Sequence, residues 1–185
     1  ACGGSSGSGP PPLTKVYVMG DSLADVGTFG LNFTVQDAGS AKGFPIWPQI
    51  VANNVGVDGS AQCSFYGLTP GSTVPTLSPK CTNFAIGGGR IVVSAAEGGT
   101  ANPLTVGTQL KTRAQLGNYT ANDLLLIDGG GNDAADLIGA YLGAAAGAQG
   151  VANYQAFLAQ QLDTATIASL LPLPNGAALA AGAYM

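Results

Sequence analysis

The chain contains no histidine, and few of its side chains carry a charge. Asp, Glu, Lys and Arg make up 9% of the 185 residues, and the net charge is −4. The six Lys and Arg residues are scattered singly, so no basic stripe could follow a phosphate backbone. We therefore expect no nucleic-acid partner. The lack of histidine also removes the side chain that most often serves as a general base.

Long apolar runs are also absent. No stretch free of Gly and Pro reaches the length of about 20 apolar residues that a membrane-spanning helix needs. No signal peptide is recognisable, so we expect any export signal to have been removed already. Because 46% of the residues are hydrophobic, we expect one globular domain.

The chain has only three cysteines. Cys63 and Cys81 flank a segment rich in Gly, Ser, Thr and Pro, which predicts a loop closed by a disulfide. Such a bridge would stabilise the fold by about 3 kcal/mol. Two buried thiols are the alternative, and a zinc pair is disfavoured because a clustered third ligand is missing. A disulfide indicates an exported protein.

Residues 1–14 are rich in Gly and Ser and then in Pro, which predicts a flexible tether. Cys2, followed by Gly and Ser, resembles the start of a bacterial lipoprotein, where a lipid-modified cysteine precedes such a tether. That resemblance implies a membrane tether through Cys2 and a periplasmic or outer-membrane location. A plain linker on a secreted protein is the alternative.

An apolar segment at 16–19 breaks abruptly into a turn that carries Ser22. Four apolar residues with two β-branched members predict a buried strand, and Gly20 permits a sharp turn after it. Ser22 would then be exposed at the end of the strand. A helix opening at about residues 23–26 would point backbone N–H groups at an oxyanion formed there.

Two later segments follow the same pattern. Residues 81–90 predict a short strand that runs into three glycines, without the sequence of a phosphate-binding or dinucleotide-binding loop. Residues 123–127 are continuously apolar after Asp123, which predicts a strand in a sheet covered on both faces. Glycines and Asn132 follow that strand, and Asp133 is expected to help start a helix at residue 134. Sites in open α/β sheets form at the carboxyl ends of strands, so these segments should meet there.

Other features are less specific. Pro48 is placed to begin a short helix, and Trp47 beside it either packs in the core or lines an acyl pocket. Arg90 either forms a surface ion pair or meets an acidic group of a substrate. The remaining apolar spacing predicts helices over residues 105–116, 136–142 and 151–171, and then a last helix that Asn175 could cap.

The three strand ends together resemble the SGNH, or GDSL-type, esterase and lipase family. Gly20-Asp21-Ser22-Leu23 matches its block I, Asn83 to Gly88 its block II, and Gly130-Gly131-Asn132-Asp133 its block III. The resemblance implies a flavodoxin-like three-layer α/β sandwich with a mainly parallel central sheet. The α/β-hydrolase elbow is the competitor, but its G-x-S-x-G motif requires glycine where Ala24 stands.

The resemblance also implies roles for individual residues. Ser22 would be the nucleophile, and its N–H, the Gly88 N–H and the Asn132 side-chain amide would form the oxyanion hole. Asp21, Asp25 and Asp133 would support these groups. No metal and no organic cofactor are implied.

The sequence departs from the family at its C-terminal D-x-x-H block, for which no match is present. The last helix also ends at the apolar Met185 without a cap. We therefore expect residues 15–185 to be the N-terminal portion of one SGNH domain, completed by a further segment or a second chain that supplies the histidine and its Asp.

The sequence thus predicts a serine ester hydrolase of the carboxylesterase or lipase type, acting through an acyl-enzyme on a small-molecule or lipid ester. An acyltransferase is the alternative enzyme. A catalytically incomplete ligand-binding or surface module is the alternative from another functional class. A third possibility is a disulfide-stapled adhesion protein, which would have no pocket beside Ser22.

Overall fold

The computed structural model describes residues 12–33, 38–39, 43–69, 72 and 74–185. The predicted lipid anchor at Cys2 and most of the predicted tether lie outside the described residues. The elements in chain order are β1 (Lys15–Met19), α1 (Trp47–Asn54), β2 (Tyr66–Gly67), β3 (Thr76–Leu77), α2 (Val106–Gln115), β4 (Asp123–Ile127), α3 (Gly131–Gly143), α4 (Ala148–Gln161), α5 (Thr164–Leu170) and α6 (Gly176–Tyr184).

A small parallel sheet lies at the centre of the α/β part. β1 pairs in parallel with β4, with Lys15 opposite Asp123 and Met19 opposite Ile127. The extended segment 82–86 runs along the other edge of β1, where the Phe84 N–H donates to the Val18 carbonyl at 2.7 Å. The predicted parallel arrangement of the three segments is confirmed, although the sheet is small.

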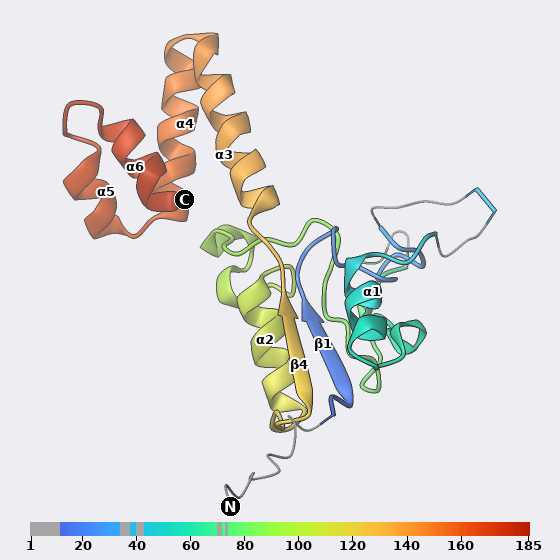
Figure 1. Cartoon of the computed structure of the whole chain (residues 1–185). Coiled ribbons are helices and arrows are strands. Elements are labelled where there is room, and N and C mark those ends of the chain that lie inside the picture. The colour runs from blue at the N-terminus through green and yellow to red at the C-terminus, as the bar shows by residue number, and fades with distance from the viewer. Residues whose placement is uncertain (1–11, 34–37, 40–42, 70–71, 73) are drawn as a thin grey trace, which may run out of the picture.

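Alternate side chains of β1 build two cores on opposite faces of the sheet. Tyr17 and Met19 pack with Phe84 and with Val106 of α2. Val16 and Val18 point the other way and pack with residues of α1, including the partly buried Trp47. α1 and α2 therefore cover opposite faces of the sheet, as Figure 1 shows. Trp47 packs in a core, which confirms that interpretation over an acyl pocket.

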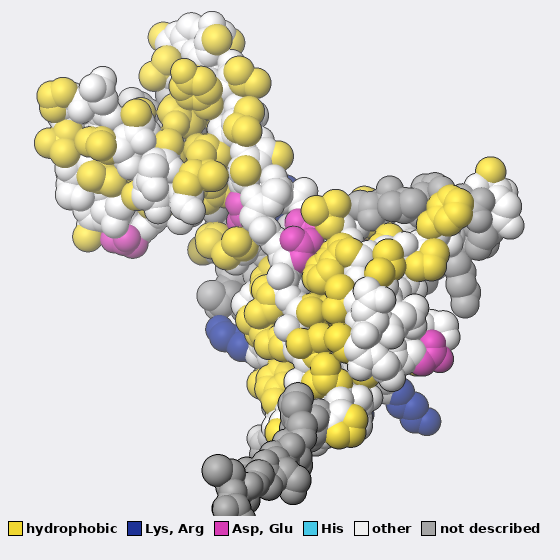
Figure 2. All heavy atoms as spheres, in the orientation of Figure 1, with side chains coloured by type: hydrophobic (Ala, Val, Ile, Leu, Met, Phe, Trp, Pro, Cys, Tyr) yellow, Lys and Arg dark blue, Asp and Glu magenta, His cyan; other side chains and the backbone are white. Residues whose placement is uncertain are grey.

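β4 is less covered than its sequence predicts. Leu124 and Leu126 pack toward α1, but Leu125 and Ile127 on the other face are 36% and 54% exposed. The prediction of a sheet covered on both faces is therefore wrong at β4. Among the described residues, no strand pairs with the second edge of β4. Figure 2, viewed as in Figure 1, shows hydrophobic side chains gathered around β4 and over α3 and α4.

Helices α3 to α6 form a separate core around Tyr154, Leu158 and Ala180. The single helix predicted over residues 151–171 is in fact α4 and α5, because the Asp163 carboxylate caps a new helix by accepting from two backbone N–H groups at 3.0 Å. Asn175 precedes α6 in the left-handed region, and its side chain makes no capping hydrogen bond. In the part of the chain that the structure describes, none of the helices has the length and apolarity of a membrane span.

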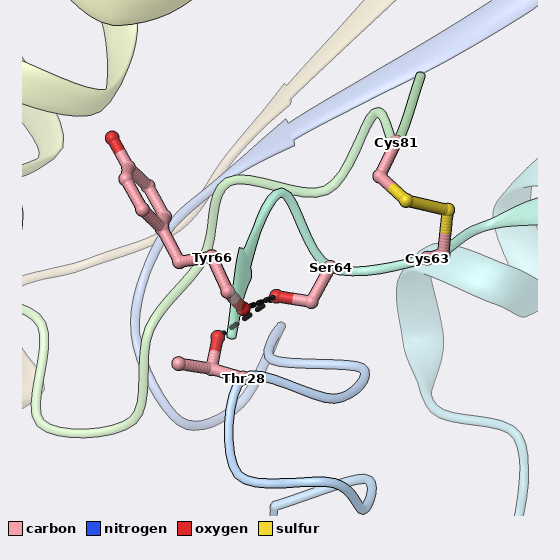
Figure 3. Close-up of a disulfide and its surroundings, with 5 residues drawn as sticks. All are labelled: Thr28, Cys63, Ser64, Tyr66 and Cys81. Carbon is pink, nitrogen blue, oxygen red and sulfur yellow. Dashed lines mark hydrogen bonds between the residues drawn. A yellow bond between two sulfur atoms is a disulfide. The ribbon is translucent and has the colours of Figure 1, made fainter. Parts of the chain in front are cut away.

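The disulfide between Cys63 and Cys81 is present, as predicted. It ties the loop before β2 to the start of segment 82–86 (Figure 3). Next to it, the Ser64 hydroxyl donates to the Tyr66 carbonyl at 2.8 Å and lies 2.9 Å from the Thr28 hydroxyl. These bonds fix the polar loops against the sheet.

Candidate active site

The turn after β1 does not open a helix at residues 23–26, so that prediction is wrong. One reverse turn forms instead, in which the Ala24 N–H donates to the Asp21 carbonyl at 3.1 Å. The Asp21 carboxylate accepts from the Leu23 N–H at 2.9 Å, and the Asp25 carboxylate accepts from backbone N–H groups beyond it. Such side-chain bonds to the backbone compete with helix formation.

Ser22 lies partly exposed in this turn. Within the described residues, neither its N–H nor its hydroxyl makes a hydrogen bond to another protein group. The hydroxyl is therefore reachable, and the N–H can donate to a bound molecule.

The glycine triplet lies directly against this turn. A Cβ at Gly89 would be 2.6 Å from the Gly20 carbonyl oxygen, so only glycine fits there. Gly88 adopts the left-handed region (φ +83°), and a Cβ built on it meets no atom within 4 Å. Its N–H has no acceptor among the described residues.

Asn132 joins the third strand end to the same place. Its Nδ2 donates to the Gly89 carbonyl at 2.7 Å. A Cβ at the preceding residue, Gly131, would lie 3.8 Å from Asp21 Oδ2. Since a side-chain amide has two N–H donors, Asn132 can donate once more. The segments that carry Ser22, Gly88 and Asn132 are thus in contact with one another.

Asp133 does not start a helix at residue 134. α3 begins earlier, at Gly131, and Gly130 takes the left-handed capping conformation (φ 98°). The Asp133 carboxylate instead accepts from the Ile91 N–H at 3.0 Å and the Val92 N–H at 3.0 Å. It therefore anchors the loop after the glycine triplet to the first turn of α3.

Asp25 is fully buried and links two of the strand ends. One carboxylate oxygen accepts from Gly27 and Thr28, and the other accepts from the Gly87 N–H at 2.8 Å. Burial raises the pKa of Asp25, and the three N–H donors act against that shift. The residue holds the Ser22 turn and the glycine triplet together.

Arg90 forms an ion pair with Asp136, which was one of the two roles expected for it from the sequence. Its Nη2 donates to Asp136 Oδ1 at 3.0 Å, and its Nε lies 2.5 Å from Asp136 Oδ2. Hydrogen bonding to that carboxylate raises the pKa of Arg90. Nη1 donates to the Gly88 carbonyl at 2.7 Å, so the guanidinium orients the triplet.

The family model described as GDSL-like lipase/acylhydrolase matches residues 16–172. The chain belongs to this family. Searches of curated proteins and of solved structures found no match to the chain. The matched range contains all three strand ends, and membership of the GDSL-like family supports an esterase or acylhydrolase activity in general terms.

Asp128 is a second carboxyl group beside the Ser22 turn of this GDSL-like chain. Its Cβ would lie 3.1 Å from a Cβ at Gly20. Burial raises the pKa of Asp128, and the neighbouring charge of Asp21 raises it further. Among the described residues, no donor reaches its buried Oδ2. Asp128 therefore lies close enough to Asp21 beside the turn for the charge of Asp21 to act on its pKa.

Gln109 is a site residue that sequence reasoning missed. It is completely buried in α2. Its Oε1 accepts from the Gly20 N–H at 2.7 Å, and its Nε2 donates to the Gly20 carbonyl at 3.0 Å. The one signal in the sequence is its position on the apolar face of the helix, three residues after Val106. This amide fixes the backbone just before Asp21 and Ser22.

We expect Gln109→Leu to destabilise the fold strongly, because the buried Gly20 N–H would lose its acceptor and the Gly20 carbonyl would keep only the Ile86 N–H. Each buried group left unpaired costs about 1–3 kcal/mol. Urea unfolding of the variant measures the loss. Gln115→Leu, at an exposed position of the same helix, is the matched control. Equal midpoints for the two variants would show that the Gln109 amide does not hold the turn.

Proposed function

We propose that this chain carries the nucleophile and the oxyanion hole of a serine ester hydrolase of the carboxylesterase or lipase type. One observation carries the proposal. At three contacting strand ends, the N–H groups of Ser22 and Gly88 lack protein acceptors within the described residues, and the Asn132 amide keeps a second donor. Free donors on segments that meet beside a reachable hydroxyl are the groups that could hold the oxyanion of acyl transfer.

In the proposed reaction Ser22 Oγ attacks the ester carbonyl carbon and gives its proton to a base. The carbonyl oxygen becomes negative and is held by the N–H groups of Ser22 and Gly88 and by the Asn132 amide. The C–O bond to the alcohol then breaks, and the base returns the proton to the leaving alcohol. Water attacks the resulting acyl-enzyme by the same route and releases the acid.

The base is proposed to be a histidine from outside this segment, since the chain has none. A carboxylate of ordinary pKa, about 4, is a weaker base than an imidazole. Burial raises the pKa of Asp25 and of Asp128, but among the described residues no carboxylate makes a hydrogen bond to the Ser22 hydroxyl. Asp25 is also engaged by backbone donors, and Asp21 accepts from the Leu23 N–H. We call the protein that carries this chain together with the histidine-bearing segment the complete protein.

The uncovered side of β4 supports the proposal that a further segment completes the domain. Its second edge has no partner among the described residues, and Leu125 and Ile127 are exposed beside it. A further strand there would extend the sheet, and we propose that the complete domain is a flavodoxin-like three-layer sandwich.

The disulfide is compatible with an extracellular protein, and we propose that the protein is exported, either secreted or held by a lipid on Cys2.

Hydrolysis of p-nitrophenyl butyrate by the complete protein, with and without Asn132→Ala, tests the proposal. Loss of one oxyanion donor is expected to lower kcat by about 10²–10³-fold. Asn153→Ala, at an exposed position in α4, is the matched control and should leave kcat unchanged.

The products decide between the remaining possibilities. In the presence of an acceptor alcohol, we expect free butyrate as the main product. A new butyrate ester as the main product would make the protein an acyltransferase. If the complete protein turns over no ester, the chain is a binding module and the proposal fails.

A further inference from the structure

A cavity of about 510 Å³ opens between the loop after Arg90 and the first turns of α2. Its lining is mainly apolar on the loop side, and on the helix side it is formed by small and polar residues. The principal lining residues are Ile91, Val92, Val93, Ala95, Gly107 and Lys111. Ligand pockets in proteins commonly have roughly 300–1,000 Å³, so this cavity is large enough to hold part of a small molecule.

One wall of the cavity is joined to the helical turn that carries Asn132. Ile91 packs over the glycines at the tip of β4, since a Cβ at Gly130 would lie 3.4 Å from its Cδ1. The Asp133 carboxylate holds the N–H groups of Ile91 and Val92. Asn132 precedes Asp133 in the same helical turn. The apolar wall is therefore fixed to the turn that carries one of the proposed oxyanion donors.

The lining favours an apolar ligand. Its threonines are already engaged, because the hydroxyls of Thr105 and Thr108 are 2.6 Å apart and Thr105 Oγ1 also accepts from the Thr108 N–H at 3.2 Å. Gly107 lies beside them, and a Cβ there would meet no atom within 4 Å. The helix side thus leaves free volume opposite the isoleucine and valines of the loop.

We propose that this cavity holds the acyl chain of the substrate, which makes esters of medium-length fatty acids the preferred class. The inference rests on the proposed function, because it requires that the acyl chain of an ester whose carbonyl is held by Asn132 runs past Ile91 into the cavity. Burial of methylene groups against Ile91 and Val93 supplies the affinity, about fourfold for each CH₂.

Binding of decanoate to the 185-residue chain, measured by calorimetry below the micelle concentration, tests the cavity without any turnover. Gly107→Leu fills the free volume and should weaken binding by about tenfold or more. Leucine is a better helix former than glycine, so the variant is expected to fold, and its melting temperature verifies this. Gly182→Leu, in α6 at a position with equally open space, is the matched control and should bind as the parent chain does.

In the complete protein, Gly107→Leu should lower the ratio of kcat/KM for the decanoate ester to that for the acetate ester by about tenfold or more. Gly182→Leu should leave this ratio unchanged. If decanoate binding is saturable and is weakened by Gly107→Leu, but the complete protein hydrolyses no ester, the proposed function is contradicted and the assignment of the cavity as a fatty-acid site is supported. If hydrolysis requires Ser22 but the chain-length preference is unchanged in Gly107→Leu, only the assignment of the cavity as the acyl-chain site is contradicted. Decanoate binding that is absent, or equal in both variants, would overturn the inference.

Discussion

Ser22→Ala is expected to abolish hydrolysis of p-nitrophenyl butyrate by the complete protein, with a fall in kcat of about 10⁴-fold or more. The alanine has no oxygen to form the acyl-enzyme, whereas the backbone donors of Ser22 and Gly88 remain. Any residual rate would come from water attacking an ester held in the oxyanion hole. Initial rates of nitrophenolate release measure the effect.

Ser60→Ala is the matched control, because Ser60 is exposed and its hydroxyl bonds only to Asp58 among the described residues. It should keep the parental rate. Retention of most activity in Ser22→Ala would mean that another residue is the nucleophile. The circular dichroism spectra of both variants should match that of the parent, since the Ser22 side chain makes no hydrogen bond within the described residues.

The 185-residue chain alone should hydrolyse the same ester about 10²–10⁴-fold more slowly than the complete protein, which is the usual contribution of a positioned general base. The isolated chain keeps both the serine hydroxyl and the proposed oxyanion donors. It lacks the imidazole that removes the serine proton in the proposed mechanism, and among the described residues the Ser22 hydroxyl makes no hydrogen bond to a carboxylate.

Comparing kcat of the two proteins at one pH checks this difference, with the Ser22→Ala form of each as the blank. Addition of imidazole to the isolated chain should raise its rate, and should raise it less in the complete protein. Turnover by the isolated chain at the full rate would show that the base lies within residues 1–185.

The sequence predicted β1, β4, the disulfide and the helix over residues 105–116 because each depends on local chemistry. An apolar run followed by glycine defines β1 and β4, and Thr105 caps α2 through its side chain. Cys63 and Cys81 were identified by the loop composition between them. The meeting of the three strand ends follows from parallel pairing, which places their carboxyl ends on one edge.

The failures came from side chains that bond to backbone groups, some two or three residues away and others far along the chain. Asp21 and Asp25 take the N–H groups that a helix at residues 23–26 would need, and Asp133 takes those of the loop at Ile91. Gln109 looked like an ordinary polar residue of an amphipathic helix, since its partner Gly20 is 89 positions away. Tertiary hydrogen bonds of this kind leave no periodic pattern in the sequence.

The central claim is that residues 22, 88 and 132 surround one substrate oxygen. A crystal structure of the complete protein after reaction with a p-nitrophenyl alkylphosphonate tests it most directly, because the bound phosphonyl group resembles the tetrahedral intermediate. The account predicts phosphorus bonded to Ser22 Oγ and one phosphonyl oxygen within about 3 Å of the Ser22 N, Gly88 N and Asn132 Nδ2 atoms. Phosphorus on another residue, or an oxygen turned away from Gly88 and Asn132, would contradict it.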